Sequence, residues 1–586
     1  MSDSLLIVSF SPIQSFISEA RRIADLSAGS KILARMAEAT RRALGASVIY
    51  PQSVDDAPNV LVAIVATDKV KDIAQAAKDA LQGEWKHIAQ QARQQVESQL
   101  RPDSEWDVIW DRQIANQWEF YWGAAELNES NYRDSYDKAR KALDAAKRAR
   151  FFDAAEEDGL KDSLSGARSA LHTKGLNAKE YWQRVAKSFD RRADVRVRNN
   201  ERLDAVGIAK RFYVWAGGKK KGFDSANDVA TSHYRDRADQ KLLAEHARST
   251  CALLDKDQFW GNDGWPESLD ADFLYEESLA LDHLKRDYEL TDVDSLKLEA
   301  AQRTLKNLYQ QIGRPPTYYA IVRLDGDDMG RAVDACQTID AHKKFSRDLS
   351  DFAKRVHERM KDQPGQVIYA GGDDVLAFLP LATALEQVND WAQMFSEVKD
   401  AKGKTCSASA GIAIVHRSFP LSAALRAAHE AERGAKVVNR RKPGGAICVH
   451  WLKRSGEELR VRSLWGTTAS RVDKVRGDFN EGLSTRFPYE LAYEADLAAM
   501  LPDENARLAL LKRLLRRHTE QTEHFPVEDR AKDWLTWSRE LDEALPEEKA
   551  NEYTTNDEEK RKRGFSELAR WLIFARFLNQ AVKGGE

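Results

Sequence analysis

The stretch QVIYAGGDDVLAFLP, residues 366–380, determines the fold that we expect for this chain. Apolar, β-branched and aromatic residues stand on both sides of a Gly-Gly-Asp-Asp turn, a pattern typical of a β-hairpin. The turn sets Asp373 beside Asp374, and neighbouring carboxylates disfavour each other's ionisation unless a cation neutralises them. Gly371 and Gly372 have no side chains, so phosphate groups could approach the backbone there.

A second acidic turn lies upstream, in the stretch YYAIVRLDGDDMG at residues 318–330. A strand-like run ends there in Asp325, and Gly326, Asp327 and Asp328 follow it. A helix-like segment separates this turn from the hairpin, which indicates a β-α-β-β unit with the end of its first strand beside the hairpin tip. Carboxylates gathered in this way are hard oxygen ligands that suit Mg²⁺ or Mn²⁺.

The N-terminal part of the chain repeats the same plan. An apolar run at 5–10 predicts a strand, a helical pattern covers 13–44 with a break expected near Gly29, and 47–50 and 60–66 predict two more strands. This first copy has Ser9, Phe10 and Ser11 where the second has its acidic turn, and it has no GGDD hairpin. If the copies are related, one is catalytic and the other is not.

Composition places the chain among large globular proteins with several domains. Its 586 residues are 42% hydrophobic, and its four cysteines are isolated, with no CxxC pair. That argues against a disulfide framework and a zinc ribbon and suits a reducing, cytoplasmic location. No signal peptide and no apolar run long enough to cross a membrane are expected. A formal net charge of −3 means that any RNA contact must use local basic patches or partner subunits.

Four domains are predicted along the chain. We expect a non-catalytic β-α-β-β domain with helical insertions at 1–235, a helical domain at 236–315, the catalytic domain at 316–455 and a C-terminal helical bundle at 456–586. The run at 446–450 should be the edge strand of the third domain. Few strand signals follow residue 456.

The ordered set of motifs resembles one family, the large polymerase-cyclase subunit of type III CRISPR effector complexes, in its Cmr-type branch. The shared stretches are the GGDD hairpin, DGDDMG, SPIQSFISEARRIADLSAGSKIL, IYPQ, PNVLVAIV, GLKDSLSGARSAL, ERLDAVGIAKRF, FDSANDVATSHYR and HEAERGAK. The resemblance covers about residues 5–450. It implies an α+β fold with two ferredoxin-like palm domains of the nucleotide cyclase type, helical insertions and a C-terminal helical bundle.

Two departures from this family matter. Many members begin with a histidine-aspartate nuclease domain, whereas this chain has no His-Asp dipeptide, so we expect no HD nuclease activity. Members also often carry a cysteine-rich zinc element between the palms. Only Cys251 stands near that position, so we expect no zinc.

The resemblance implies that ATP is polymerised into cyclic oligoadenylate by two-metal nucleotidyl transfer when guide RNA pairs with target RNA, with other Cmr-type subunits as partners. Asp325, Asp373 and Asp374 are the candidate catalytic residues, and with the Gly326 carbonyl they are the candidate ligands of two Mg²⁺ or Mn²⁺ ions. The candidate nucleotide contacts are Gly326, Asp327, Gly371, Gly372 and Lys436, with Ser11 and Gln14 from the resemblance alone.

Several readings stay open at this point. Lys436 is either a triphosphate contact or an exposed helical lysine, and His429 is either a base or a packing residue. Of Asp327 and Asp328, one would face the metals and the other cap the next helix. Alternative functions are a GGDEF-like cyclic dinucleotide synthase, an enzyme that adenylates another small molecule, and a catalytically silent scaffold subunit of the same complex.

Overall fold

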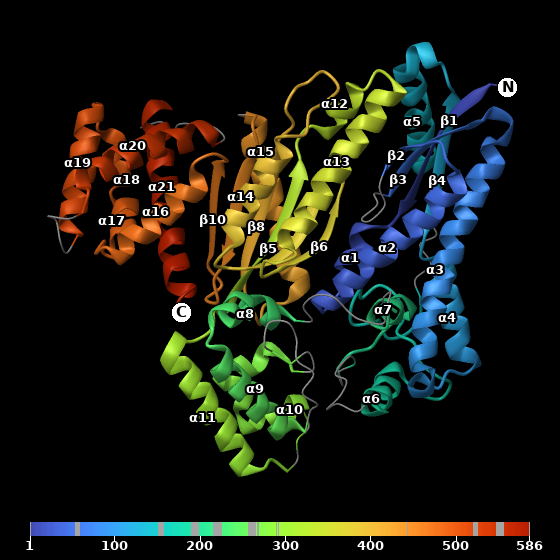
Figure 1. Cartoon of the computed structure of the whole chain (residues 1–586), viewed down its shortest axis with the longest axis horizontal. Helices are drawn as coiled ribbons and strands as arrows, with labels where there is room; N and C mark the ends of the chain where they lie inside the picture. The colour runs from blue at the N-terminus through green and yellow to red at the C-terminus, as the bar shows by residue number, and fades with distance from the viewer. Residues whose placement is uncertain are drawn as a thin grey trace.

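We analysed a computed structural model of the chain (Figure 1). It describes residues 2–52, 59–149, 157–188, 197, 200–214, 225–255, 265, 266, 269–288, 290, 292–441, 443–519, 525–545 and 556–584. Two β-sheets form the centre of the molecule, and helices cover both faces of each.

The GGDD hairpin lies in a six-stranded sheet with the order β10-β9-β8-β5-β7-β6. β5 is central and pairs antiparallel with β7 and with β8. The first four strands in the chain order, β5 to β8, give the arrangement fourth-first-third-second, which is the ferredoxin-like order predicted for a palm. The strands are β5 Tyr318–Gly326, β6 Gln366–Gly371, β7 Asp374–Pro380, β8 Ala408–His416, β9 Ala446–Leu452 and β10 Glu458–Leu464.

Both faces of this sheet are buried, which explains why β5 and β8 read as continuous apolar runs. One face packs on α13 Ile339–Met360 and α14 Ala384–Phe395. The opposite face, with Tyr319 and Ile321 of β5, packs on α15 Leu421–Arg441, α8 Ala226–Arg237 and the start of α2.

The first palm has the same order of strands, β2-β3-β1-β4. Its strands are β1 Asp3–Ser11, β2 Val48–Tyr50, β3 Val60–Ala66 and β4 Glu119–Glu126. α2 Ile23–Leu44 and α3 Val70–Leu100 pack on one face, and α5 Tyr132–Arg148 packs on the other. β4 was not predicted, because its residues EFYWGAAE are mostly half exposed and lack the alternation of a strand with one buried face.

A glycine in the fourth strand of each palm allows the following helix to pack closely. A Cβ on Gly123 of β4 would lie 2.2 Å from the backbone nitrogen of Leu143 in α5. A Cβ on Gly411 of β8 would lie 2.0 Å from the backbone nitrogen of Glu432 in α15. The two palms therefore share a packing detail as well as a strand order.

Two sequence-based expectations about local structure are wrong. The helix break lies between α1 Gln14–Ser18 and α2, not near Gly29, which is buried within α2 against Phe16 and Lys210. The run at 446–450 is not an edge strand, because β10 pairs with β9 and extends the sheet beyond residue 455. β10 alternates charged and apolar residues, and this short pattern was overlooked between helical segments.

The remaining helices form two groups (Figure 1). One lies between the palms in the chain and has its own core: α9 Gln240–Leu254, α10 Leu281–Tyr288 and α11 Ser295–Ile312. The other is C-terminal: α16 Thr468–Asn480, α17 Phe487–Tyr493, α18 Ala495–Met500, α19 Glu504–Arg517, α20 Val527–Ala544 and α21 Asn556–Ala581. Three further helices accompany the first palm: α4 Ser104–Asn116, α6 Ala178–Ser188 and α7 Ala205–Arg211.

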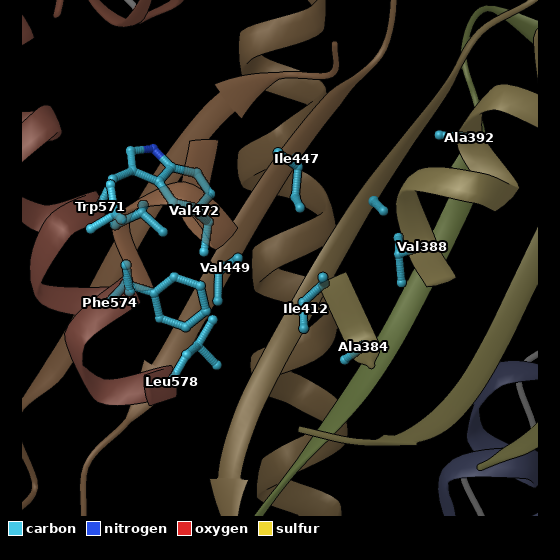
Figure 2. Packing of buried hydrophobic residues seen from close by; sticks show 14 of the residues in the cluster. Ala384, Val388, Ala392, Ile412, Ile447, Val449, Val472, Trp571, Phe574 and Leu578 are labelled. Atoms are coloured by element: carbon cyan, nitrogen blue, oxygen red, sulfur yellow. The ribbon is translucent and has the colours of Figure 1, made fainter. Parts of the chain in front are cut away.

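The C-terminal helices are not an independent unit, because their core continues into that of the second palm. Figure 2 shows Trp571, Phe574 and Leu578 of α21 pointing toward Val449 of β9. Trp451 of β9 also stacks on Phe577, with ring centroids 3.7 Å apart. α8 likewise crosses the boundary predicted at residue 235, since it packs on β5 and β7 of the second palm.

Each of the four cysteines is buried. Within the described ranges, no helix has both the length and the apolarity needed to span a bilayer.

Candidate active site between the palms

Strand pairing brings the two acidic turns together. Asp325 at the end of β5 lies directly opposite Asp374 at the start of β7 in the antiparallel ladder. The backbone N–H of Gly326 donates to the carbonyl of Asp373 at 3.1 Å. A Cβ on Gly326 would lie 2.8 Å from the Asp373 Cβ, so a larger residue would push the turns apart. The convergence that the sequence predicts for Asp325 and the hairpin tip is therefore present.

The pKa values of the three carboxylates are shifted in different directions by burial and by their mutual charges. Burial, with the charge of Asp325, raises the pKa of Asp373 to about 6. Burial also raises the pKa of Asp374 well above its usual range, with further contributions from a hydrogen bond to Asp325 and the neighbouring charges. Burial opposes ionisation of Asp325 too, but the hydrogen bond from Asp374 and the nearby Lys436 outweigh it and lower its pKa. Ionisation of each carboxylate in the cluster therefore disfavours ionisation of its neighbours.

These residues fit a divalent cation by their donor chemistry. Within the described residues, no three His, Cys, Asp or Glu side chains are arranged so that they could hold a metal ion by themselves. The three carboxylates of this cluster are no exception. Mg²⁺ does not require such an arrangement, because it commonly binds one or two carboxylates and completes its shell with water and substrate phosphates. Buried, like-charged carboxylates from adjacent strands are the groups that such a cation would neutralise.

Lys436 of α15 is the positive charge at the junction of the two turns. Its Nζ lies 2.5 Å from the Asp325 carboxylate and donates to the backbone carbonyls of Asp325 and Gly326 at 2.9 and 2.8 Å. It also contacts Oδ1 of Asp327 at 2.9 Å. Lys436 is therefore not an ordinary exposed helical lysine, and the Gly326 carbonyl predicted to bind metal already accepts one hydrogen bond. The triphosphate contact predicted for Lys436 stays a prediction.

Asp327 is buried below the turn. Its carboxylate accepts hydrogen bonds from the hydroxyls of Ser409 and Ser407 at 2.8 and 2.9 Å, besides the contact with Lys436. Its backbone N–H donates to the carbonyl of Ser407. Both of its carboxylate oxygens are thus used by protein donors, so Asp327 ties the turn to β8. A contact of Asp327 with nucleotide stays a prediction.

Asp328 and His429, which the sequence also left open, lie outside this cluster. Asp328 has a left-handed backbone, with φ of 54°, and precedes the short helix α12 Met329–Asp334 without capping it through its side chain. That side chain is exposed and pairs with Arg331 at 3.4 Å. His429 is half exposed on α15 and lies 3.5 Å from Glu432, which in turn binds Arg323 of β5.

A cavity of about 500 Å³ opens beside the hairpin, between the palms. The second palm contributes Gly371, Gly372 and one face of α13, and the first palm contributes Lys31, Tyr50 and Pro51. Gly372 has φ of +64°, and a Cβ there would lie 3.3 Å from the Tyr50 hydroxyl. Burial, with the charges of Asp373 and Asp374, raises the pKa of Tyr50.

Tyr50 is the residue of this region that sequence reasoning missed. It stands in the IYPQ stretch, but no motif connects β2 of one palm to the hairpin of the other. The predicted first-palm contacts are placed elsewhere, because neither Ser11 nor Gln14 lines the cavity. Ser11 ends β1, where its hydroxyl donates to Glu119 at 3.0 Å, and Gln14 begins α1.

The strand register shows which residues of the first palm take the places of the acidic residues in the second. Arg323 pairs with Gly411 in the second palm, and Ile7 pairs with Gly123 in the first. Two residues further along, Ser9 takes the place of Asp325. Ser9 pairs with Val60, which takes the place of Asp374. The first palm therefore has a hydroxyl and an isopropyl group where the second has two carboxylates.

Contacts between the palms hold the elements that follow the acidic turn. Arg133 of α5 pairs with Asp334 of α12 at 2.8 Å. The Tyr132 hydroxyl is hydrogen bonded to Nδ1 of His342 in α13 at 2.8 Å. Near the hairpin, the backbone N–H of Gln52 donates to the Ser346 hydroxyl at 3.0 Å.

Comparison with known proteins agrees with this architecture. Residues 318–443 match the family model of the Cas10/Cmr2 second palm domain, and residues 5–57 match that of the CRISPR-associated protein Cmr2 N-terminal region. The CRISPR system Cmr subunit Cmr2 of Pyrococcus furiosus is 30% identical over 372 residues, which are 55% of this chain and 41% of that protein. The chain therefore spans less than half of this relative.

Other relatives are more distant. A Cas10/Csm1 protein of Streptococcus thermophilus, described as a CRISPR system single-strand-specific deoxyribonuclease of subtype III-A, is 33% identical over 127 residues, 20% of this chain and 16% of that protein. Among solved structures, type III-B Cmr-beta in the apo state has a TM-score of 0.62 at 12% identity, over 90% of this chain and 78% of that chain. Type III-B Cmr-beta bound to cognate target RNA has a TM-score of 0.59 at 12% identity, over 90% of this chain and 79% of that chain.

These structural similarities show a shared fold. The two family models match the second palm and the start of the first, so these two regions of the chain are similar to Cas10/Cmr2 proteins.

Proposed function

We propose that this chain is the large subunit of a Cmr-type, RNA-guided CRISPR effector complex and that its second palm polymerises ATP into cyclic oligoadenylate when target RNA binds. The observation that carries the proposal is the pairing of Asp325 with Asp374, beside Asp373, at the edge of a cavity between two palms. Guide RNA, target RNA and other Cmr-type subunits are the partners that this function requires.

The reaction joins the 3′-hydroxyl of one nucleotide to the α-phosphate of another. A bond forms between the 3′ oxygen and the α-phosphorus, the bond to pyrophosphate breaks, and the hydroxyl proton is released to solvent. Asp325, Asp373 and Asp374 would hold the divalent cations, which when bound lower the pKa of the attacking hydroxyl and neutralise the leaving group. A final transfer within one product closes the ring.

The protein's own part in this reaction is mainly positioning. Lys436 and Asp327 fix the turn that carries Asp325, and strand pairing fixes Asp374 opposite it. The cavity is lined by Gly371 and Gly372, the two residues that precede Asp373, and it has room for a nucleoside. The first palm, which has Ser9 in place of Asp325, holds substrate without supplying the cation ligands.

The test is the product formed from ATP by the complex assembled with its guide RNA, with and without target RNA, in Mg²⁺ and in Mn²⁺, analysed by mass spectrometry. We expect cyclic oligoadenylate with target RNA present. The double variant Asp373→Ala/Asp374→Ala should lose product by about a hundredfold or more, because it removes charge stabilisation at the reacting phosphate. Asp328→Asn is the matched control, since this acidic residue of the same turn faces solvent.

Other outcomes separate the alternatives. A cyclic dinucleotide made from GTP would point to a GGDEF-like synthase, and an adenylated small molecule would point to a different acceptor. No product under any condition, from a complex that still binds target RNA, would mean a silent scaffold. Full activity in the Asp373→Ala/Asp374→Ala variant would overturn the site assignment.

A further inference from the structure

Tyr50 is a first-palm residue in the wall of the cavity beside the GGDD turn. It is the last residue of β2, and its hydroxyl is the nearest atom that a Cβ on Gly372 would meet, at 3.3 Å. Its ring stacks on His342 of α13, with centroids 6.1 Å apart, so the side chain is held in place from the second palm. The position of the hydroxyl is therefore fixed by both palms together.

The hydroxyl of Tyr50 is available to a ligand. It makes no hydrogen bond with any residue in the part of the chain that the structure describes, whereas the nearby Tyr132 hydroxyl is bonded to His342. Tyr50 also lines the cavity, and the carboxylates of Asp373 and Asp374 act on it electrostatically. The other polar side chains of the cavity wall are Lys31, Ser346, Ser350, Lys354, His357 and Glu358. Of the polar side chains in this wall, Tyr50 is the one whose hydroxyl lies beside Gly372 of the hairpin turn, and a polar group placed there is typical of a specificity contact.

The position of the Tyr50 hydroxyl beside Gly372, the residue before Asp373, indicates which part of a nucleotide would meet Tyr50. The reacting 3′ oxygen of one nucleotide and the α-phosphate of the other must lie at the carboxylates, and in each nucleotide the reacting group is attached to the ribose. The base lies further away, where Leu349 and Ala353 of α13 give the cavity an apolar surface with Ser346 and Ser350 beside it. The group next to the hairpin turn is thus the sugar.

We infer that Tyr50 hydrogen-bonds a ribose hydroxyl of a nucleotide in the cavity between the palms and so selects ribonucleotides over deoxyribonucleotides. This inference rests on the proposed function, because it takes the cavity as a nucleotide site. It assigns to the first palm a contact at the sugar, supplied by β2 and distinct from the cation ligands of the second palm.

Binding to the full-length chain tests this inference without turnover. Dissociation constants are measured for ATP, 2′-deoxyATP and 3′-deoxyATP, with Ca²⁺ in place of Mg²⁺, for the unaltered protein, Tyr50→Phe and Tyr136→Phe. We expect the unaltered protein to bind one of the deoxynucleotides about threefold to tenfold more weakly than ATP, the range for one neutral hydrogen bond. Tyr50→Phe should bind ATP and that deoxynucleotide equally.

Tyr136→Phe is the control because Tyr136 belongs to the same ring cluster, with its centroid 5.3 Å from that of His342, but does not line the cavity. It should keep the preference of the unaltered protein. An unchanged ratio in Tyr50→Phe, or a loss of affinity equal for all three nucleotides, would overturn the inference and leave the proposed function intact. Failure of the unaltered protein to bind ATP would overturn both.

Discussion

Lys436 shows how much one side chain contributes to the acidic turn. It is the cation nearest to both Asp325 and Asp327, and the attraction of these carboxylates outweighs its own burial and raises its pKa. Asp327 is 3% exposed and has no other charged partner among the contacts of the described residues. Removing the ammonium would leave a buried carboxylate held only by two serines.

We therefore predict that Lys436→Met lowers the free energy of unfolding by about 3–5 kcal/mol, the usual cost of leaving one member of a buried ion pair alone. Asp327→Asn in the same chain should recover part of the loss, because a neutral amide can keep the serine hydrogen bonds. The measurement is urea unfolding without nucleotide.

The control for this prediction is Lys344→Met, which removes an exposed lysine paired with Asp348 on α13. It should change the free energy of unfolding by less than about 1 kcal/mol. Equal stability of the two lysine variants would contradict a structural role for Lys436.

At this scale the sequence predicts charges better than contacts. Asp325, Asp373 and Asp374 could be identified because each lies at a strand end or in the turn beside it, within a local pattern. Tyr50, Ser407 and Ser409 could not, because their partners are far away in the chain and hydroxyl residues mark no motif by themselves. The role of Lys436 depends on where α15 crosses β5, which helical periodicity does not specify.

Among the secondary-structure elements, β4 and α5 of the first palm correspond closely to β8 and α15 of the second palm. Gly411 approaches the Glu432 nitrogen and the Ala428 carbonyl, and Gly123 approaches the Leu143 nitrogen and the Ala139 carbonyl in the same pattern. Four residues further along, Lys147 of α5 then takes the place of Lys436. The helix keeps its lysine where the strand has lost its carboxylates.

Gly411→Ala should strongly destabilise the second palm. The added methyl group would lie 2.0 Å from a backbone nitrogen, so β8 and α15 would have to separate. We expect a loss of about 1–3 kcal/mol or more from overpacking, seen as a lower midpoint of thermal unfolding.

Gly477→Ala is the matched control, because Gly477 lies within α16 and a Cβ there meets nothing within 4 Å. That change should raise stability by up to about 1 kcal/mol, since alanine favours helix. A Gly411→Ala protein that melts like the control would show that β8 and α15 can separate without cost.

The elements themselves were predicted unevenly. β5, β6 and β7 follow from long apolar runs around obvious turns. β4 and β10 did not, because β4 is mostly half exposed and β10 alternates charged with apolar residues. Pairing with a neighbouring strand, rather than a local pattern, makes them strands. The break before α2 was placed wrongly because glycine usually interrupts a helix. Gly29 instead lies within α2, where close packing against Phe16 and Lys210 explains the absence of a side chain.

For the whole molecule, the palms are joined by an interface that reaches the active site. Tyr50, Tyr132 and Tyr136 of the first palm surround His342 of the second, and Arg133 is the charged group beside it. Burial, assisted by the charge of Arg133, lowers the pKa of His342 to about 4. The ring is therefore neutral in the folded protein at neutral pH.

The stability of this interface should depend on pH. Between about pH 6.5 and pH 4 the unfolded chain binds a proton at His342 that the folded chain does not. The stability that the neutral His342 contributes is therefore complete above about pH 6.5 and is lost as the pH falls toward 4. The loss amounts to at most about 3 kcal/mol. Urea unfolding at a series of pH values measures it.

His342→Asn provides the comparison, because its side chain cannot titrate but can keep a hydrogen bond to Tyr132. The variant should lose less stability than the unaltered protein over this pH range. Parallel losses in both proteins would mean that other groups account for the acid sensitivity.

The bond between Tyr132 and His342 has a consequence for how the family can diverge. Replacement of either residue by an apolar one leaves the other with an unpaired polar atom in a buried interface, so such single replacements should be removed by selection. Among homologues that keep the carboxylate cluster, tyrosine and histidine at these positions should be inherited as a pair or exchanged as a pair. Covariation of these two positions would then identify chains in which the two palms have evolved together.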